Sequence, residues 1–299
     1  MTAGVTRPRI GTVFVPGWAP ELLRPVAAAA DSSGIDDLWF WEDCFNESGP
    51  ALASTALALT ETVRVGVGLM PVPLRNVALS AMEIATMQRL FPGRFVPVIG
   101  HGVQRWMAQV GAKARSPLTL LTEYAVALRR LLAGESVSVD GDYVHLDEVQ
   151  LRWPPAAPVQ LMIGGEGPKT LALAATYGDG TMLTSALSDE RIRESCDIVR
   201  ATIGDTTHEI VGHLMVFRGA GAEARLTEHL ATWPTGSTGI AAEGAEGAAT
   251  VAAAIDRVAG FGMTTVLVHS IDEEPDPVGF VEWLGHDVMP LVAYPKSTA

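Results

Sequence analysis

Polar side chains that could do chemistry stand where two apolar stretches of the chain end. Asp43 and Cys44 follow the apolar residues 36–41, within the sequence WEDCF, and His101 stands between two glycines after residues 95–99. A carboxylate can hydrogen-bond a ligand, a thiol can act as a nucleophile, and a histidine can shuttle a proton near neutral pH. We predict that Asp43, Cys44 and His101 are catalytic, and that Asp43 and His101 also contact a cofactor.

Each of these residues also has a purely structural interpretation. Asp43 could cap a loop, Cys44 could fill a small space in the core, and a single histidine is more often a satisfied structural group. A catalytic Cys44 would further need a base such as His101 close by. The spacing along the chain leaves these alternatives open.

A glycine-rich turn is the third candidate for chemistry. The apolar residues 159–163 are followed by GGEGPK at 164–169 and then by apolar residues at helical spacing. Pro168 suits the first position of a helix, where unpaired backbone N–H groups and the helix dipole attract anions. We predict a phosphate site here, with Lys169 as a nearby cation. The pattern is neither GxGxxG nor a P-loop, so a tight strand-to-helix connection is the alternative.

Other combinations of residues do not support further chemistry. His208 and His213 stand five apart in a β-branched stretch, where that spacing points the two side chains to opposite faces. The HExxH motif of zinc enzymes needs a four-residue spacing on a helix, so we predict no metal site. The chain also has no GxSxG or CxxC motif, so hydrolase and disulfide-exchange functions have no positive support.

Eight apolar stretches alternate with helical patterns along the chain. The strands are expected at 10–15, 36–41, 63–69, 95–99, 159–163, 181–183, 209–217 and 265–269. The helices are expected at 21–30, 51–60, 77–90, 103–110, 117–132, 168–177, 189–202, 248–259 and 277–292, with a short one near 223–231 in a Gly/Ala-rich loop. Nearly continuous apolar strands that alternate with helices indicate a parallel (β/α)8 TIM barrel.

One segment departs from this alternation. Between the fourth and fifth strands, residues 134–158 alternate apolar and polar side chains around Asp140-Gly141, which predicts a β-hairpin. We interpret this segment as an insertion within a single domain that spans residues 1–299. In such barrels the active site lies at the carboxyl ends of the strands. The loops of interest are therefore 42–45, 68–75, 100–106, 164–169 and 184–185.

Bulk composition excludes several partners. The 299 residues are 48% hydrophobic and 18% charged, and the formal net charge is −13. Nucleic acids and anionic membranes attract basic surfaces, so neither is an expected partner. The two cysteines are too few for a disulfide framework, and no signal peptide or 18-residue apolar run stands out. We predict a soluble, cytoplasmic protein that acts on a small-molecule substrate.

Three longer stretches resemble a known family. They are PVPLRNVALSAMEIATM (71–87), GHGVQRWMAQVG (100–111) and IGGEGPKTLALAATYGDG (163–180). Together they are similar to the bacterial luciferase-like flavin and deazaflavin oxidoreductases, nearest to the coenzyme F420-dependent branch. The resemblance covers residues 10–203 well and the C-terminal third more loosely.

The resemblance implies a cofactor ring inside the barrel mouth and its phosphate at the glycine turn. In deazaflavin members a non-prolyl cis peptide follows the third strand, and the matching bond here is Gly68–Leu69. A glutamate tail on the deazaflavin would favour a cation such as Lys169 or Arg75. We combine the resemblance with the residues expected at the barrel mouth. Together they predict cofactor contacts from Asp43, Gly68, Leu69, Met70, His101, Gly102, Gly164, Gly165, Glu166, Gly167 and Thr184. It also implies a homodimer.

Two positions depart from family members that oxidise sugar phosphates. Those members carry an Asp-His pair after the second strand and a proton-donating Glu after the fourth, where this chain has Cys44 and Val103. We therefore predict an oxidoreductase that transfers hydride between coenzyme F420 and a small organic substrate other than a sugar phosphate. The alternatives are an FMN-dependent monooxygenase and a non-catalytic flavin-binding protein. A Schiff-base aldolase is disfavoured, because no lysine lies in a predicted strand.

Overall fold

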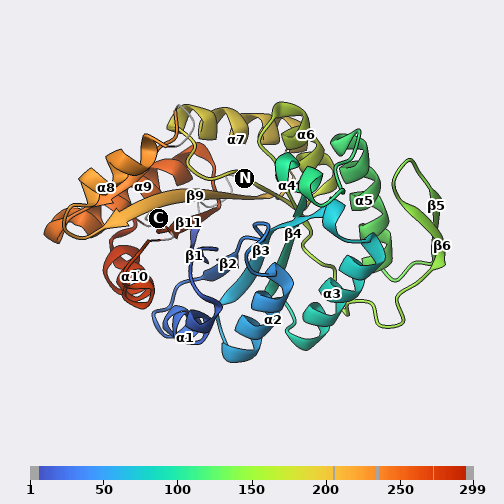
Figure 1. Cartoon of the computed structure of the whole chain (residues 1–299), viewed down its shortest axis with the longest axis horizontal. Helices are drawn as coiled ribbons and strands as arrows, with labels where there is room; N and C mark the ends of the chain where they lie inside the picture. Colours follow the sequence, from blue (N-terminus) through green and yellow to red (C-terminus); the bar gives the residue numbers. More distant parts are fainter. Residues whose placement is uncertain (1–6, 205, 233–235, 272, 294–299) are drawn as a thin grey trace, which may run out of the picture.

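The computed structural model describes residues 7–204, 206–232, 236–271 and 273–293 (Figure 1). Eight parallel strands close into a barrel, with neighbours in the order β9, β11, β1, β2, β3, β4, β7 and β8, and β8 pairs with β9 to complete the ring. The barrel strands are β1 (Arg9–Phe14), β2 (Asp37–Phe40), β3 (Arg64–Pro71), β4 (Phe95–Gly100), β7 (Met162–Gly164), β8 (Gly180–Met182), β9 (Glu209–Arg218) and β11 (Thr265–His269). The predicted TIM barrel is confirmed.

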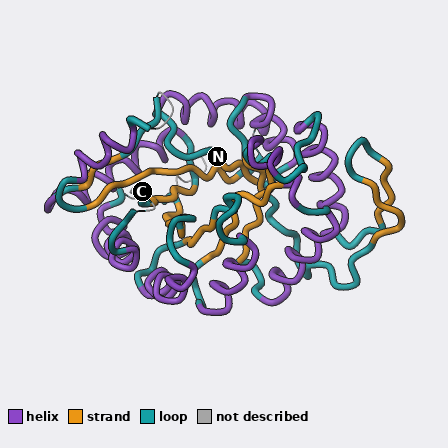
Figure 2. Tube along the Cα trace, viewed as in Figure 1, coloured by secondary structure: helices purple, strands orange, loops and turns teal. Residues whose placement is uncertain are grey.

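Helices surround the ring of strands, as the purple and orange segments of Figure 2 show. They are α1 (Leu23–Ser32), α2 (Gly49–Leu59), α3 (Val77–Leu90), α4 (Gln104–Gln109), α5 (Pro117–Leu132), α6 (Pro168–Tyr177), α7 (Asp189–Ile203), α8 (Ala222–Leu230), α9 (Gly247–Phe261) and α10 (Pro277–Trp283). Side chains set several helix starts: Asn76 accepts a hydrogen bond from the Ala78 amide, and Ser116 accepts one from Thr119. The apolar strands are buried on both faces, because their side chains fill the barrel interior on one face and pack against these helices on the other.

A two-stranded antiparallel sheet lies between β4 and β7 along the chain. It consists of β5 (Val137–Asp140) and β6 (His145–Val149), within residues 134–158. The carboxylate of Glu123 on α5 accepts backbone hydrogen bonds from Asp142, Tyr143 and Val144, at 2.9–3.1 Å. The hairpin turn is thereby fixed to α5.

Two parts of the chain differ from the predicted elements. The helix predicted at 277–292 is divided into α10, a π-helical turn at Leu284–Val288 and a 3-10 turn at Met289–Leu291. Pro290 has no amide hydrogen to continue an α-helix, and Gly285 packs against the backbone of Ser33. The short strand β10 (Ile240–Ala242) was not predicted, because it forms only by pairing with the end of β9.

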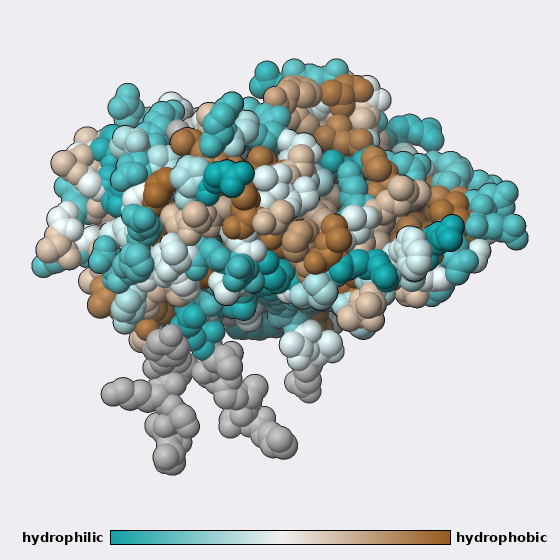
Figure 3. Space-filling model, turned by 90° about the horizontal axis from the view of Figure 1, so that it is seen from below, coloured by the Kyte–Doolittle hydropathy of each residue, from teal (hydrophilic) through white to brown (hydrophobic). Residues whose placement is uncertain are grey.

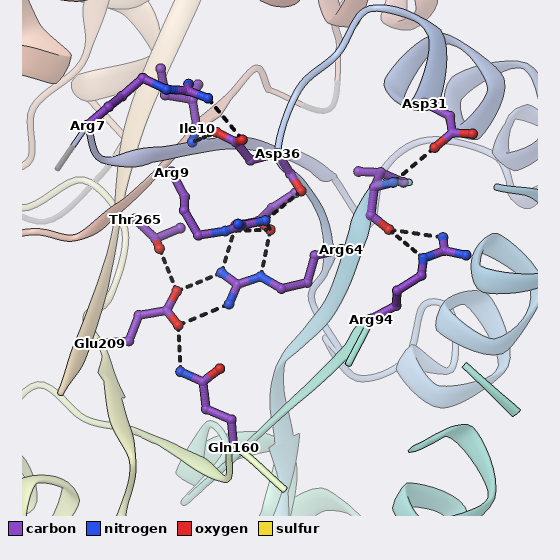
Figure 4. A network of polar contacts seen from close by, with 12 residues as sticks. Arg7, Arg9, Ile10, Asp31, Asp36, Arg64, Arg94, Gln160, Glu209 and Thr265 are labelled. Carbon is purple, nitrogen blue, oxygen red and sulfur yellow. Dashed lines mark hydrogen bonds and ion pairs between the residues drawn. The ribbon is translucent and has the colours of Figure 1, made fainter. Parts of the chain in front are cut away.

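An ion-pair network closes the amino-terminal end of the barrel (Figure 4). Arg64 donates to Asp37 at 2.7 and 2.8 Å and to Glu209 at 2.6 and 3.0 Å. Arg9 also binds Asp37, and Thr265 and Gln160 donate to Glu209. The side chain of Asp37 is fully buried, so the network binds the first residues of five strands together around a buried charge.

Candidate active site at the barrel mouth

Parallel closure brings most of the predicted site residues to one end of the barrel. Asp43 and Cys44 follow β2, His101 and Gly102 follow β4, the glycine turn follows β7, and Thr184 follows β8. Because all eight strands run in the same direction, these loops meet at the carboxyl end of the barrel. Asp43, Cys44, His101, Gly102 and Gly165 are partly exposed there, Thr184, Glu166 and Gly167 are exposed, and Gly164 is buried.

The end of β3 forms the floor of this mouth. The side chain of Leu69 lies against the backbones of Gly100 and Gly164, where an added Cβ would stand 2.6 Å from a Leu69 methyl carbon. The Gly68–Leu69 peptide bond is cis, as the family resemblance implies, and a second non-prolyl cis bond joins Cys44 and Phe45. Leu69 is partly exposed, whereas the side chain of Met70 is buried in the hydrophobic core.

The glycine turn leaves the start of α6 open to a ligand. Gly167 occupies the N-cap position without a side-chain hydrogen bond, and Pro168 has no amide hydrogen. A Cβ placed on Gly167 would meet no atom within 4 Å, and Lys169 is exposed in the first turn. An uncapped helix start beside open space suits a phosphate group.

His101 lies next to this turn. Its Nε2 is 3.2 Å from Oγ1 of Thr170 on α6, and its buried Nδ1 has no well-formed hydrogen bond to a described residue. Burial lowers the pKa of His101 by more than a backbone contact with Pro117 raises it, so the ring is neutral at pH 7. A buried ring nitrogen without a well-formed hydrogen bond is a position where a ligand atom could complete one.

Cys44 lacks the surroundings of an activated nucleophile. Burial and the negative charges of Glu42 and Asp43 raise the pKa of its thiol, so the thiol stays protonated at neutral pH. The His101 ring contacts Thr170 rather than Cys44. These surroundings favour a contact role for Cys44 over a nucleophilic one.

An ion pair fixes the loops after β2 and β3 to each other. Arg75 donates two hydrogen bonds to the carboxylate of Glu42, and its Nε is 3.4 Å from a carboxylate oxygen of Glu83. The amide of Gly49 also donates to Glu42. Arg75 is thus neutralised by two carboxylates. Lys169 remains as the exposed cation suggested for an anionic part of the cofactor.

Sequence reasoning missed a group of rings inside the mouth. Trp41, His213 and His269 are mutual edge-to-face neighbours, with ring centroids 4.9–5.8 Å apart. Nδ1 of His269 donates to the carbonyl of Ser270 at 2.8 Å, so Nε2 of the neutral ring accepts the hydroxyl of Ser185 at 2.8 Å. Trp41 directly follows β2, His213 lies in the middle of β9 and His269 ends β11, and the only sequence signal was a histidine within each of two apolar strands.

His208 and His213, the two histidines considered for metal binding, contact different residues. Nε2 of His208 is 2.8 Å from Oγ1 of Thr181, whereas His213 belongs to the ring group. Over the described ranges, no group of three or more His, Cys, Asp or Glu side chains could hold a metal ion. The same residues include no helix long and apolar enough to cross a membrane.

The buried histidines predict a pH dependence of stability. Burial lowers the pKa of His213 to about 3 and that of His269 to about 4, from 6.5 when exposed. Between pH 6.5 and 4.5 the unfolded chain therefore binds protons that the folded chain does not. Each histidine should reduce the free energy of unfolding by about 2.5 kcal/mol over this interval.

Urea unfolding at pH 7.0 and 4.5 measures this effect. His213→Phe keeps the ring packing and should lose about half of the two histidines' combined contribution to the acid destabilisation. His101 and His208, whose pKa values burial also lowers, are common to both proteins and cancel in the comparison. An unchanged pH dependence in His213→Phe would show that His213 is not buried in a neutral state.

Comparison with known proteins places this barrel in a family. Residues 15–263 match the luciferase-like monooxygenase family. The chain belongs to that family.

Individual relatives agree with this placement. A 5,10-methylenetetrahydromethanopterin reductase from Methanolobus tindarius is 30% identical over 177 residues, 59% of this chain and 54% of the relative. An F420-dependent glucose-6-phosphate dehydrogenase from Kineococcus radiotolerans is 28% identical over 180 residues, 56% of this chain and 53% of the relative. The chain thus matches about half the length of these curated relatives.

A solved structure matches the whole fold. The coenzyme F420-dependent tetrahydromethanopterin reductase from Methanopyrus kandleri superposes with a TM-score of 0.81 over 97% of this chain and 100% of that chain. The sequence identity of the pair is 16%, so this match supports the fold alone.

Proposed function

We propose that this protein is an oxidoreductase that transfers hydride between coenzyme F420 and a small organic substrate. The observation that carries the proposal is the uncapped glycine turn at the barrel mouth, beside the neutral ring of His101, whose Nδ1 has no well-formed hydrogen bond. This arrangement fits a phosphate and a polar ring edge at adjacent positions. Support for F420 in particular comes from the curated relatives, which include F420-dependent dehydrogenases.

The proposed roles follow from position. The turn at Gly164, Gly165, Glu166 and Gly167 would hold the phosphate through its backbone, with Lys169 adding a positive charge. Gly68 and Leu69 would support the ring from the floor, and Thr184 and Gly102 would border it. Met70 could contribute only through its backbone. The cofactor supplies the hydride chemistry when bound, and the protein supplies position and electrostatics.

The substrate would lie between the ring and the loops after β2 and β8. Asp43, Cys44 and His101 are the proposed contacts, and Ser185 offers a hydroxyl already bonded to a neutral His269. Val103 is exposed at the start of α4, so the position of the family's proton-donating Glu holds no acid. A substrate other than a sugar phosphate is therefore favoured.

A parallel turnover assay tests the proposal. Oxidised F420 is supplied with small alcohols, and reduced F420 with the matching aldehydes and ketones, without oxygen. Reduced FMN is supplied with the same carbonyl compounds and oxygen. We expect a change in the F420 absorbance with at least one substrate pair. Oxygen-dependent product formation with FMN alone would support the monooxygenase, the activity in the description of the matched family. Tight cofactor binding without turnover would support a non-catalytic flavin-binding protein.

We also propose that the protein is a homodimer and is cytoplasmic. Both cysteines are free, which suits a reducing compartment. Leu79, Met82 and Leu90 form an exposed apolar stripe along one face of α3. Figure 3 looks onto the side that carries α1, α2 and α3, where brown hydrophobic areas lie among hydrophilic ones.

Charge placed on this stripe should separate the subunits. Leu79→Glu with Met82→Glu is expected to convert a dimer to a monomer in light scattering after size exclusion, because two carboxylates per subunit would be buried in the interface. Leu291→Glu is the control, since Leu291 is exposed to 52% and Leu79 to 46%, and Leu291 lies on a different element. A double variant with the mass of the unmodified protein would contradict the assignment.

A further inference from the structure

A pocket lies between the loops that follow β3 and β4 and the hairpin. It has a volume of about 480 Å³ and is bordered by residues 72–77 after β3, residues 111–115 before α5, and residues 143–145 of the hairpin. Leu120 and Tyr124 of α5 complete it. Of the residues considered above for the cofactor or substrate, Arg75 alone lines this pocket, and its charge is already paired with Glu42 and Glu83.

The charge of this pocket is opposite to that of the protein. The chain carries 34 acidic and 21 basic residues, yet every charged residue that lines the pocket is basic. Arg75 is neutralised by Glu42 and Glu83, and the ring of His145 is paired with Asp140 at 2.7 Å. Two cations remain to be considered.

Lys113 and Arg115 are these two cations. Both are exposed at the pocket, and neither has an acidic partner among the described residues. A protein of net negative charge repels anions at a distance. Two unpaired cations side by side make the potential at this pocket locally positive, so an anion can bind there.

The walls of the pocket are fixed by hydrogen bonds. Glu123 holds the turn that carries Tyr143 and Val144 against α5. The amide of Ser116 donates to the hydroxyl of Tyr143 at 2.7 Å, which ties the hairpin to the segment before α5. The hydroxyl of Tyr124 donates to Ser80 at 2.6 Å. The shape of the pocket is therefore built by contacts between three separate elements.

Apolar groups line the pocket between these polar contacts. Leu74, from the turn after β3, is 37% exposed and forms most of this apolar surface, and Val72 and Val144 add small areas at 3% and 5% exposure. A ligand there would meet an apolar surface and two free positive charges at once. Inorganic phosphate would use only the charges, and a neutral apolar molecule would use only the walls.

We propose that this pocket binds an amphipathic organic anion, with Lys113 and Arg115 at its charged group and Val72, Leu74 and Val144 against its apolar body. The ligand class is a carboxylate, phosphate or sulfonate attached to a hydrocarbon or aromatic part. The anion has two sources, either a separate small molecule or an anionic part of a cofactor bound at the mouth. The site does not require the proposed F420 chemistry.

Fluorescence titration with 1-anilinonaphthalene-8-sulfonate, an aromatic sulfonate, tests the site without any cofactor. Lys113→Glu with Arg115→Glu should weaken binding at least about tenfold, because attraction becomes repulsion. Arg24→Glu with Arg152→Glu makes the same charge change at exposed positions outside the pocket and should leave affinity within about twofold. Ala112→Trp fills the pocket, keeps both cations and should also abolish binding. Circular dichroism and thermal melts establish that each variant is folded.

Competition with F420 distinguishes the two possible sources of the anion, and other outcomes would show that the site does not exist. Displacement of the probe by F420, with weaker F420 binding in the Lys113/Arg115 variant, would identify part of the cofactor as the anion. Probe that stays bound beside F420 would identify a separate molecule. Equal probe affinity in the pocket and control variants, binding retained in Ala112→Trp, or no saturable binding to the unmodified protein would overturn the site. None of these three results bears on F420 turnover.

Discussion

Gly167→Asp is expected to weaken F420 binding by about 10- to 100-fold while leaving the protein folded. The new carboxylate would stand at the N-cap of α6, within a few ångströms of the proposed phosphate, where like charges repel by about 1–4 kcal/mol. The substitution has room, since no atom lies within 4 Å of the new Cβ and the backbone is extended at this position. Fluorescence titration with F420 measures the effect.

Gly167→Asn is the matched control for this experiment. Asparagine has the shape of aspartate and is an equally good N-cap. The Asn variant therefore differs from the Asp variant only in lacking the negative charge. We expect both variants to be at least as stable as the unmodified protein, and only the aspartate to lose F420 affinity strongly. Gly165 is the poorer test position, because a Cβ there would stand 2.8 Å from Thr170. Equal F420 affinity in the Asp and Asn variants would show that the phosphate does not bind at this turn.

Arg64→Met is expected to lower the free energy of unfolding by about 3–5 kcal/mol, the range for a buried charge deprived of its partner. The substitution would leave the fully buried carboxylate of Asp37 with Arg9 alone and would remove two hydrogen bonds from Glu209. Burial raises the pKa of Glu209, but the hydrogen bonds and charge of Arg64 outweigh it and hold that pKa below its usual value. Urea unfolding at pH 7 measures the loss.

Arg9→Met provides the comparison within the same network. Arg9 also binds Asp37, but its side chain is 41% exposed, so solvent screens the pair and we expect a loss of about 1 kcal/mol. Below pH 4.5 the Arg64→Met deficit should shrink, because protonation of Glu209 removes the stabilisation that its lowered pKa represents. Losses of equal size in Arg64→Met and Arg9→Met would contradict a central role for Arg64.

Elements with strong local signals could be predicted from the sequence. The predicted bounds of α3 and α5 agree with the structure, because Asn76 and Ser116 cap them and Pro117 fits the first turn of α5. The apolar strands and the hairpin around Asp140-Gly141 could also be predicted from their sequence pattern. The residues at the mouth then followed from the barrel rule, since strand ends in a parallel barrel share one face.

Contacts that depend on barrel closure could not be predicted. His213 and His269 are 56 positions apart and meet because β9 and β11 pair side by side. Arg64 and Glu209 are 145 positions apart and meet because both begin barrel strands. In each case the sequence showed a polar residue in an apolar strand, but its partner was set by the packing of distant elements.

Cofactor choice is the central claim, and one measurement tests it most directly. The purified apoprotein is titrated in parallel with F420 and with FMN, and binding is followed by fluorescence. We predict saturable binding of F420 with an affinity at least about tenfold tighter than that of FMN. Tighter binding of FMN would contradict it in favour of the monooxygenase. Binding of neither below about 100 μM, a free energy of only ~5.5 kcal/mol, would contradict the cofactor site itself.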